Sequence, residues 1–68
     1  MYMNIEVERL RRYLSKAELA KALSIPTQEL EDWIHRRQAI PANGLRSLMR
    51  LFNGCTLEYL LKEKRRLP

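Results

Sequence analysis

The apolar side chains of this sequence recur at helical spacing along almost its whole length. Residues with β-branched side chains are few, and they never alternate with polar residues over four positions. Strands are therefore not expected. The sequence predicts an all-α fold of five helices. The β-branched residues are Ile5, Val7, Ile25, Thr27, Ile34, Ile40 and Thr56.

The first helix is predicted over about residues 4–13. Asn4 can cap its N-terminus, because an Asn side chain accepts a hydrogen bond from a free backbone N–H of the first turn. Val7, Leu10 and Leu14 fall on one face of this helix. We expect that face to point into the core.

The second helix begins at a capping box. Ser15 can accept a hydrogen bond from the backbone of Glu18, and the Glu18 carboxylate can reach back to the N–H of Ser15. The helix runs on through a predicted buried stripe of Leu19, Ala20 and Leu23.

Residues 24–26, Ser-Ile-Pro, interrupt the second helix. Proline lacks an amide hydrogen but suits the first turn of a new helix, so a third helix is predicted from about Pro26 or Thr27 to about His35. Its inward residues are predicted to be Leu30, Trp33 and Ile34. Its solvent-facing residues are predicted to be Thr27, Gln28, Glu31, Asp32 and His35.

Residues 36–42 are predicted to connect to a fourth helix over about residues 43–52, which Gly54 follows. A short fifth helix begins at Thr56. The chain is then one domain over residues 1–61, since a chain this short holds a single core, with a basic tail over residues 62–68. The core residues expected on the fourth helix are Leu45, Leu48, Met49 and Phe52.

The residue types exclude several classes of function. Cys55 is the only cysteine, so no intrachain disulfide forms, and we expect a cytoplasmic protein. Cys55 and His35 cannot supply a four-ligand zinc site, and no GxGxxG, GxxxxGK or HExxH motif is present. We therefore expect no enzyme, no metal and no cofactor. No run of about 18 apolar residues is present to span a membrane.

The charge balance is the first positive indication of function. Thirteen Lys and Arg residues against eight Asp and Glu residues give a net charge of +5, and the isoelectric point is near 9.9. A basic balance of this size in one small domain is typical of proteins that bind nucleic acid. Charge alone equally fits a basic soluble protein without that role.

The second and third helices, joined by a few residues, form a helix-turn-helix arrangement. The run from Leu14 to Trp33, LSKAELAKALSIPTQELEDW, resembles the helix-turn-helix of the Cro/repressor family, also called lambda-repressor-like or xenobiotic-response-element proteins. That family's pattern is roughly L-T-x-x-E-L-A-x-x-L-G-V-S-x-x-x-I-S-x-W. The likeness extends over about residues 5–61 and includes GCTLEYLL at residues 54–61, similar to G-V-S-L-D-E-L-L. Ser24 replaces the usual turn glycine.

The resemblance implies a five-helix domain that binds double-stranded DNA, often as a homodimer on a two-fold operator, in a bacterial or phage regulator at the nucleoid. It places the third helix in the major groove. The residues matching base-contacting positions are Thr27, Gln28 and Asp32, and those matching backbone-contacting positions are Lys16, Arg36 and Arg37. We add His35 as a phosphate-facing residue on its position alone.

Three of these assignments have alternatives. Thr27 fits a helix cap as well as a base or phosphate contact. Asp32 either accepts from a cytosine or pairs with Arg36 four residues later, and the pair is slightly favoured. Gln28 is either an ordinary exposed side chain of the helix or a base reader, and base reading is favoured because a Gln amide can bond adenine bidentately.

Acidic residues on the third helix motivate a second function. Glu29, Glu31 and Asp32 would be repelled by phosphates but would suit a basic patch on a protein. The alternative is therefore a protein-interaction module on the same fold, such as an antirepressor or an adaptor. Near the C-terminus, Leu57, Tyr59 and Leu61 fit a dimer contact and simple packing on the core equally well.

Overall fold

The computed structural model describes residues 1–63, which contain five α-helices and no strand. The all-α prediction is confirmed for this part of the chain. Most of the predicted basic tail, residues 64–68, lies outside the described residues. The helices are α1 (Met3–Arg11), α2 (Lys16–Ala22), α3 (Thr27–Ile34), α4 (Ala42–Leu51) and α5 (Leu57–Leu60).

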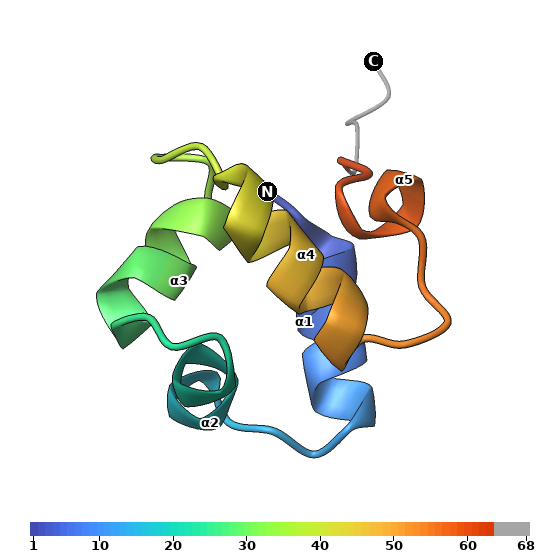
Figure 1. Ribbon diagram of the computed structural model, residues 1–68, viewed down its shortest axis with the longest axis horizontal. Coiled ribbons are helices and arrows are strands. Elements are labelled where there is room, and N and C mark those ends of the chain that lie inside the picture. Colours follow the sequence, from blue (N-terminus) through green and yellow to red (C-terminus); the bar gives the residue numbers. More distant parts are fainter. Residues whose placement is uncertain (64–68) are drawn as a thin grey trace.

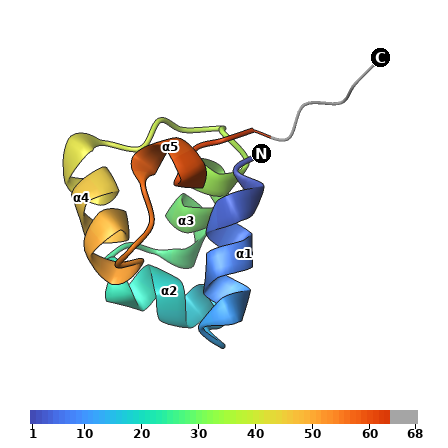
Figure 2. The same ribbon diagram turned by 90° about the vertical axis from the view of Figure 1, so that its right-hand side faces the viewer.

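The helices surround one core. Helices α2 and α5 lie at opposite ends of the molecule, and α1 and α4 lie on opposite sides of it (Figures 1 and 2). Helix α3 packs against α2, and α1 contacts both α3 and α5. The side chains with no exposed surface come from all five helices and the residue after α4. They are Ile5, Leu19, Leu30, Ile34, Leu48, Phe52 and Leu60.

Local capping signals in the sequence explain where three of the helices begin. The capping box at α2 is present, with the Ser15 hydroxyl accepting from Glu18 N at 3.0 Å and Ser15 N donating to the Glu18 carboxylate at 2.8 Å. The Thr56 hydroxyl accepts from Tyr59 N at 3.1 Å and so caps α5. Pro26 precedes the first residue of α3, in extended geometry.

The predicted inner face of α1 is wrong. Val7 is 38% exposed and Leu10 is 61% exposed, while Ile5 and Glu8 are the buried residues of this helix. The helix is rotated because Glu8 finds polar partners inside the molecule, which offsets the cost of burying its carboxylate. Asn4 does not cap the helix either, since its side chain donates to the carbonyl of Tyr59 at 2.8 Å.

Helix α4 begins at Ala42, one residue before the predicted start, and Leu48 and Phe52 are buried as expected. Gly44 lies inside this helix and is buried against Trp33. A Cβ atom on Gly44 would lie 2.7 Å from an atom of the Trp33 ring, closer than side chains pack. The missing side chain therefore lets α4 approach the inner face of α3.

Candidate nucleic-acid interface

Helix α3 has one face buried in the core and the opposite face toward solvent. Leu30 and Ile34 have no exposed surface and Trp33 is 2% exposed, which confirms that these residues face inward. Four residues, 23–26, separate α2 from α3, and the two helices pack on each other. The core thus fixes which way the opposite face of α3 points.

Thr27 and Gln28 lie exposed at the N-terminal end of α3, as predicted. Thr27 is the first helical residue, and no side-chain cap bond is present at this end of the helix, so its interpretation as a cap is wrong. The physical reason is that Pro26 occupies the capping position. Among residues 1–63, the Thr27 hydroxyl has no hydrogen-bond partner, which leaves it available to a ligand.

A chain of polar contacts runs from Gln28 through Asp32 to Arg37. Gln28 Nε2 donates to Asp32 Oδ1 at 3.1 Å, and Arg37 Nε donates to the same oxygen at 2.9 Å. Arg37, and then Gln28, hold the pKa of the Asp32 carboxyl below its ordinary value. The expected pair between Asp32 and Arg36 is therefore wrong, because the turn after α3 carries Arg36 away and brings Arg37 back.

Arg36 instead binds the C-terminal segment. Its guanidinium pairs with the Glu63 carboxylate and lies 5.8 Å from the centre of the Tyr2 ring. This pair lowers the pKa of Glu63. Arg36 has a left-handed backbone with φ +61°, which produces the turn that ends α3. The pair joins the loop after α3 to the segment after α5.

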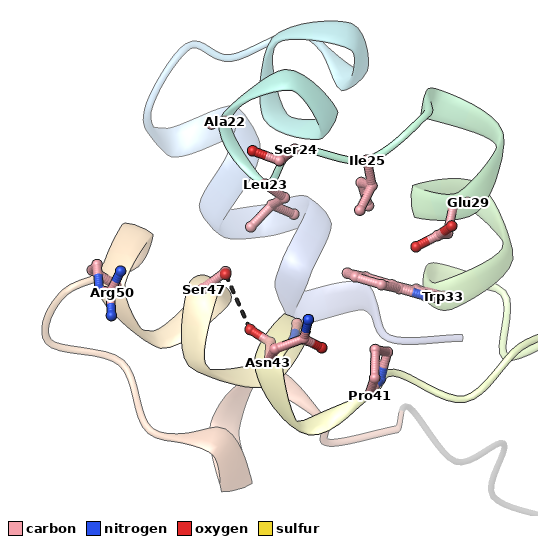
Figure 3. Close-up of a pocket in the computed structure, with 11 residues that line it drawn as sticks. Ala22, Leu23, Ser24, Ile25, Glu29, Trp33, Pro41, Asn43, Ser47 and Arg50 are labelled. Carbon is pink, nitrogen blue, oxygen red and sulfur yellow. Dashed lines mark hydrogen bonds between the residues drawn. The ribbon is translucent and has the colours of Figure 1, made fainter.

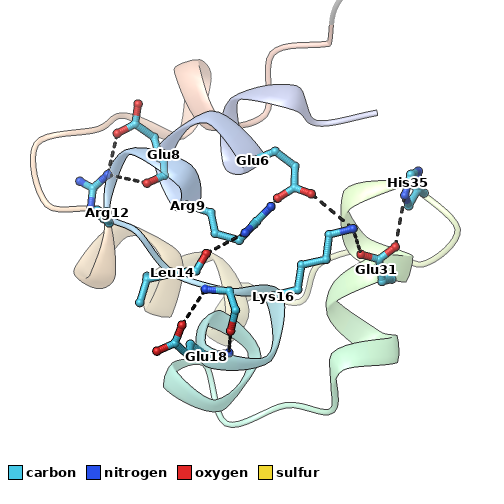
Figure 4. A network of polar contacts seen from close by, with 10 residues as sticks. Glu6, Glu8, Arg9, Arg12, Leu14, Lys16, Glu18, Glu31 and His35 are labelled. Atoms are coloured by element: carbon cyan, nitrogen blue, oxygen red, sulfur yellow. Dashed lines mark hydrogen bonds and ion pairs between the residues drawn. The ribbon is translucent and has the colours of Figure 1, made fainter.

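Lys16 lies at the start of α2 between two carboxylates. Its Nζ is 2.5 Å from Glu31 Oε1 on α3 and 3.6 Å from Glu6 Oε1 on α1 (Figure 4). His35 Nε2 is 3.4 Å from the other Glu31 oxygen, an ion pair when the imidazole is protonated. The contact with Glu31 raises the pKa of Lys16, and Lys16 lowers the pKa of Glu31. These pairs connect α1, α2 and α3.

The structure therefore divides the predicted site residues between separate polar contacts. Gln28, Asp32 and Arg37 form one group, Lys16 and His35 meet at Glu31, and Arg36 pairs with Glu63. Every predicted contact residue except Thr27 already has an internal polar partner. Most of these partners are the carboxylates of α3, so Glu31 and Asp32 add little net negative charge to its outer face. A phosphate that approached this surface would have to replace a carboxylate at Lys16 or Arg36, whereas Arg37 has guanidinium N–H groups that Asp32 does not use. The ion pairs on this surface are partly exposed, so such an exchange costs little.

Three cations outside the predicted basic tail were not identified from the sequence. Within residues 1–63, no ion pair involves Lys21, Arg46 or Arg50, nor Lys62 of the predicted basic tail. Arg46 and Arg50 lie four residues apart on α4 and are exposed. That spacing puts them on one helix face, which is the signal that could have identified them.

A polar pocket opens between the turn before α3 and the start of α4 (Figure 3). It has a volume of about 390 Å³, and Ser24, Trp33, Asn43 and Arg50 are among the residues that line it. The side-chain oxygen of Asn43 accepts a hydrogen bond from the backbone N–H of Gly44 at 2.9 Å. No group of three or more His, Cys, Asp or Glu side chains in the described residues could hold a metal ion.

Comparisons with protein-family models, with curated proteins and with solved structures found no match to this chain. Among the helices within residues 1–63, none combines the length and the apolar character needed to cross a membrane.

Proposed function

We propose that this protein is a sequence-specific regulator that binds double-stranded DNA and represses by occupying its operator. The outer face of α3 lies in the major groove, where Thr27 and Gln28 contact bases. The observation that carries the proposal is that α3 has one face closed in the core and exposes Thr27 and Gln28 at its N-terminal end. An α-helix fits the major groove, and the N-terminal residues of a recognition helix are those that reach the bases.

The charges of the molecule support the same proposal. The net charge is +5, and cations with no ion pair within residues 1–63 lie on α2, on α4 and after α5. Lys16, His35 and Arg36 contact phosphates once their carboxylate partners are displaced. Arg37 contacts a phosphate with the guanidinium N–H groups that it does not direct to Asp32. A homodimer that places two α3 helices about 34 Å apart, on a two-fold operator, gives the affinity that one copy lacks. The proposal involves no catalytic step and no cofactor.

The alternative of a protein-interaction module depends on the acidity of α3. Two of its three carboxylates, Glu31 and Asp32, are paired with Lys16 and Arg37. Of the α3 carboxylates, Glu29 alone has no ion pair within residues 1–63. A face with one unpaired carboxylate attracts a basic protein patch weakly. This pairing favours DNA as the partner.

Selection from a random duplex pool, followed by binding at several salt concentrations, tests the proposal. We expect affinity to fall steeply between about 50 and 200 mM salt. Arg37→Ala should weaken binding to all sequences and reduce the salt slope by about one, because it removes one phosphate contact. Gln28→Ala should relax the preference at one base pair.

Gln38→Ala is the matched control, since Gln38 is an exposed glutamine in the loop after α3. It should leave the selected sequence unchanged. The proposal is wrong if the wild-type protein binds selected and random duplexes equally, or if Gln28→Ala selects the wild-type sequence.

A further inference from the structure

The contact between Gln28 and Asp32 has a consequence for which base α3 recognises. We infer that Asp32 is a positioning residue: its carboxylate holds the Gln28 amide in the one orientation that suits adenine and excludes guanine. This inference rests on the proposed function, because it concerns the same surface of α3. It differs from a direct contact between Asp32 and a base.

The chemistry of the amide gives the reason. Gln28 has one carbonyl oxygen and two N–H bonds, and one of the N–H bonds is directed to Asp32 Oδ1 at 3.1 Å. The carbonyl oxygen and the second N–H of the Gln28 amide remain free to bind a base. Adenine presents one donor and one acceptor in the major groove, N6–H and N7, and these match the two groups that Gln28 has left.

Guanine presents two acceptors in the major groove, O6 and N7. A glutamine can satisfy both only by turning both N–H bonds toward the base. The bond to Asp32 prevents this, and the reversed amide would place the Gln28 carbonyl oxygen against the carboxylate. The contact therefore works against guanine as well as for adenine.

Arg37 makes this arrangement compatible with DNA. A bare carboxylate on the face of α3 would be repelled by the phosphates that border the groove. Arg37 Nε lies 2.9 Å from Asp32 Oδ1 and neutralises it. The spacing of four residues between Gln28 and Asp32 puts both side chains on one face of the helix, so the contact forms without any change in the backbone.

The test compares duplexes that differ only at the base pair that Gln28 contacts, as found by selection. In the wild-type protein we expect adenine to be preferred over guanine by at least about tenfold. Asp32→Ala should reduce this ratio by roughly 3- to 10-fold, because the amide is then free to turn and must be ordered on binding. The adenine-to-guanine ratio should fall because the Asp32→Ala variant binds the guanine duplex more tightly than the wild-type protein does.

Two variants separate orientation from charge. Asp32→Asn keeps an oxygen that accepts from Gln28 but removes the negative charge, so the preference for adenine should be retained. Glu29→Ala removes a neighbouring carboxylate that has no hydrogen bond to Gln28. It should change the affinity for all duplexes and leave the adenine-to-guanine ratio unchanged. Thermal melting followed by circular dichroism confirms that each variant is folded.

The outcomes distinguish this inference from the proposed function. If Asp32→Ala keeps the wild-type ratio, Asp32 does not position Gln28, while DNA recognition by α3 stands. A loss of preference for cytosine at another base pair would show that Asp32 contacts a base directly, and would overturn the inference. If the wild-type protein selects no sequence, the proposed function fails and this inference fails with it.

Discussion

Two clusters of charged side chains in this molecule contain similar residue types but differ in their exposure to solvent. In the Glu8 cluster, one carboxylate is 2% exposed, accepts hydrogen bonds from Arg12 at 2.6 Å and Tyr59 at 2.7 Å, and forms an ion pair with Arg11 at 3.3 Å. In the α3 surface cluster, the paired side chains are partly exposed, although Glu31 Oε1 is buried, and the pairs link α2 to α3. The Glu8 cluster consists of Glu8, Arg11, Arg12 and Tyr59. The α3 surface cluster consists of Lys16, Gln28, Glu31, Asp32, His35 and Arg37.

The difference lies in access to water. The contacts of Glu8 join α1 to α5 and replace the water that the carboxylate loses on folding, so breaking them leaves a charge without solvent. The Asp32 and Glu31 side chains are 27% and 24% exposed, against 3% for Glu8, so breaking their ion pairs costs less. The first cluster therefore stabilises the fold, and the second is available for binding.

The largest expected effect on stability comes from removing the buried carboxylate of the Glu8 cluster. Glu8→Ala should lower the free energy of unfolding by about 3 kcal/mol, because it removes the acceptor shared by Arg12 and Tyr59. Urea denaturation followed by Trp33 fluorescence measures this loss. Asp32→Ala is the comparison, and it should move the urea midpoint much less. Equal losses in the two variants would mean that burial does not distinguish the clusters.

The dependence of stability on pH sharpens the comparison. Arg12, and then Tyr59, lower the pKa of Glu8 below its ordinary value near 4.5. A carboxyl with a lowered pKa contributes its full stabilisation above its unfolded pKa and loses it as the pH falls through the folded pKa. We expect Glu8→Gln to cost about 2 kcal/mol at pH 7 and much less at pH 2–3.

Denaturation curves collected between pH 7 and pH 2 check this prediction. Tyr59→Phe keeps the carboxylate but removes one of its donors, so it should lose part of the acid dependence. A Glu8→Gln curve that runs parallel to that of the wild-type protein at every pH would show that Glu8 does not carry this dependence.

The sequence predicted best what local signals determine. The capping box at Ser15, the proline before α3 and the inward residues around Trp33 depend on neighbours within one or two helical turns. The face of α1 could not be predicted in this way, because the burial of Glu8 depends on Tyr59, 51 residues later. The closeness of α4 to α3 depends likewise on the pairing of Gly44 with Trp33.

In the candidate site too, features set by local sequence could be predicted, and features set by contacts between distant elements could not. Helical spacing was enough to predict that Thr27 and Gln28 are exposed. The internal partners of Lys16 and Arg36 could not be predicted, because each pair crosses between elements and depends on the packing of whole helices. The contact of Asp32 with Arg37 depends on the left-handed turn at Arg36, which no residue type at that position indicates.

The smallest expected effect on stability comes from the left-handed backbone in the turns after α1 and before α3. Tyr13 after α1 and Ser24 before α3 both have left-handed backbones, with φ +56° and +59°. An L side chain in this region costs about 1 kcal/mol, which glycine avoids, although glycine also loses more entropy on folding. Ser24→Gly should therefore raise the free energy of unfolding by about 0.5 kcal/mol.

Ser24→Ala is the matched control, because it removes the hydroxyl and keeps the Cβ atom that makes the left-handed conformation costly. Among residues 1–63 the Ser24 hydroxyl makes no hydrogen bond, so the alanine variant should resemble the wild-type protein. If the gain from glycine appeared in DNA affinity and not in stability, the turn would be limiting the position of α3. Equal stability of all three proteins would show that the turn carries no strain, and the difference between the clusters would then depend on side chains alone.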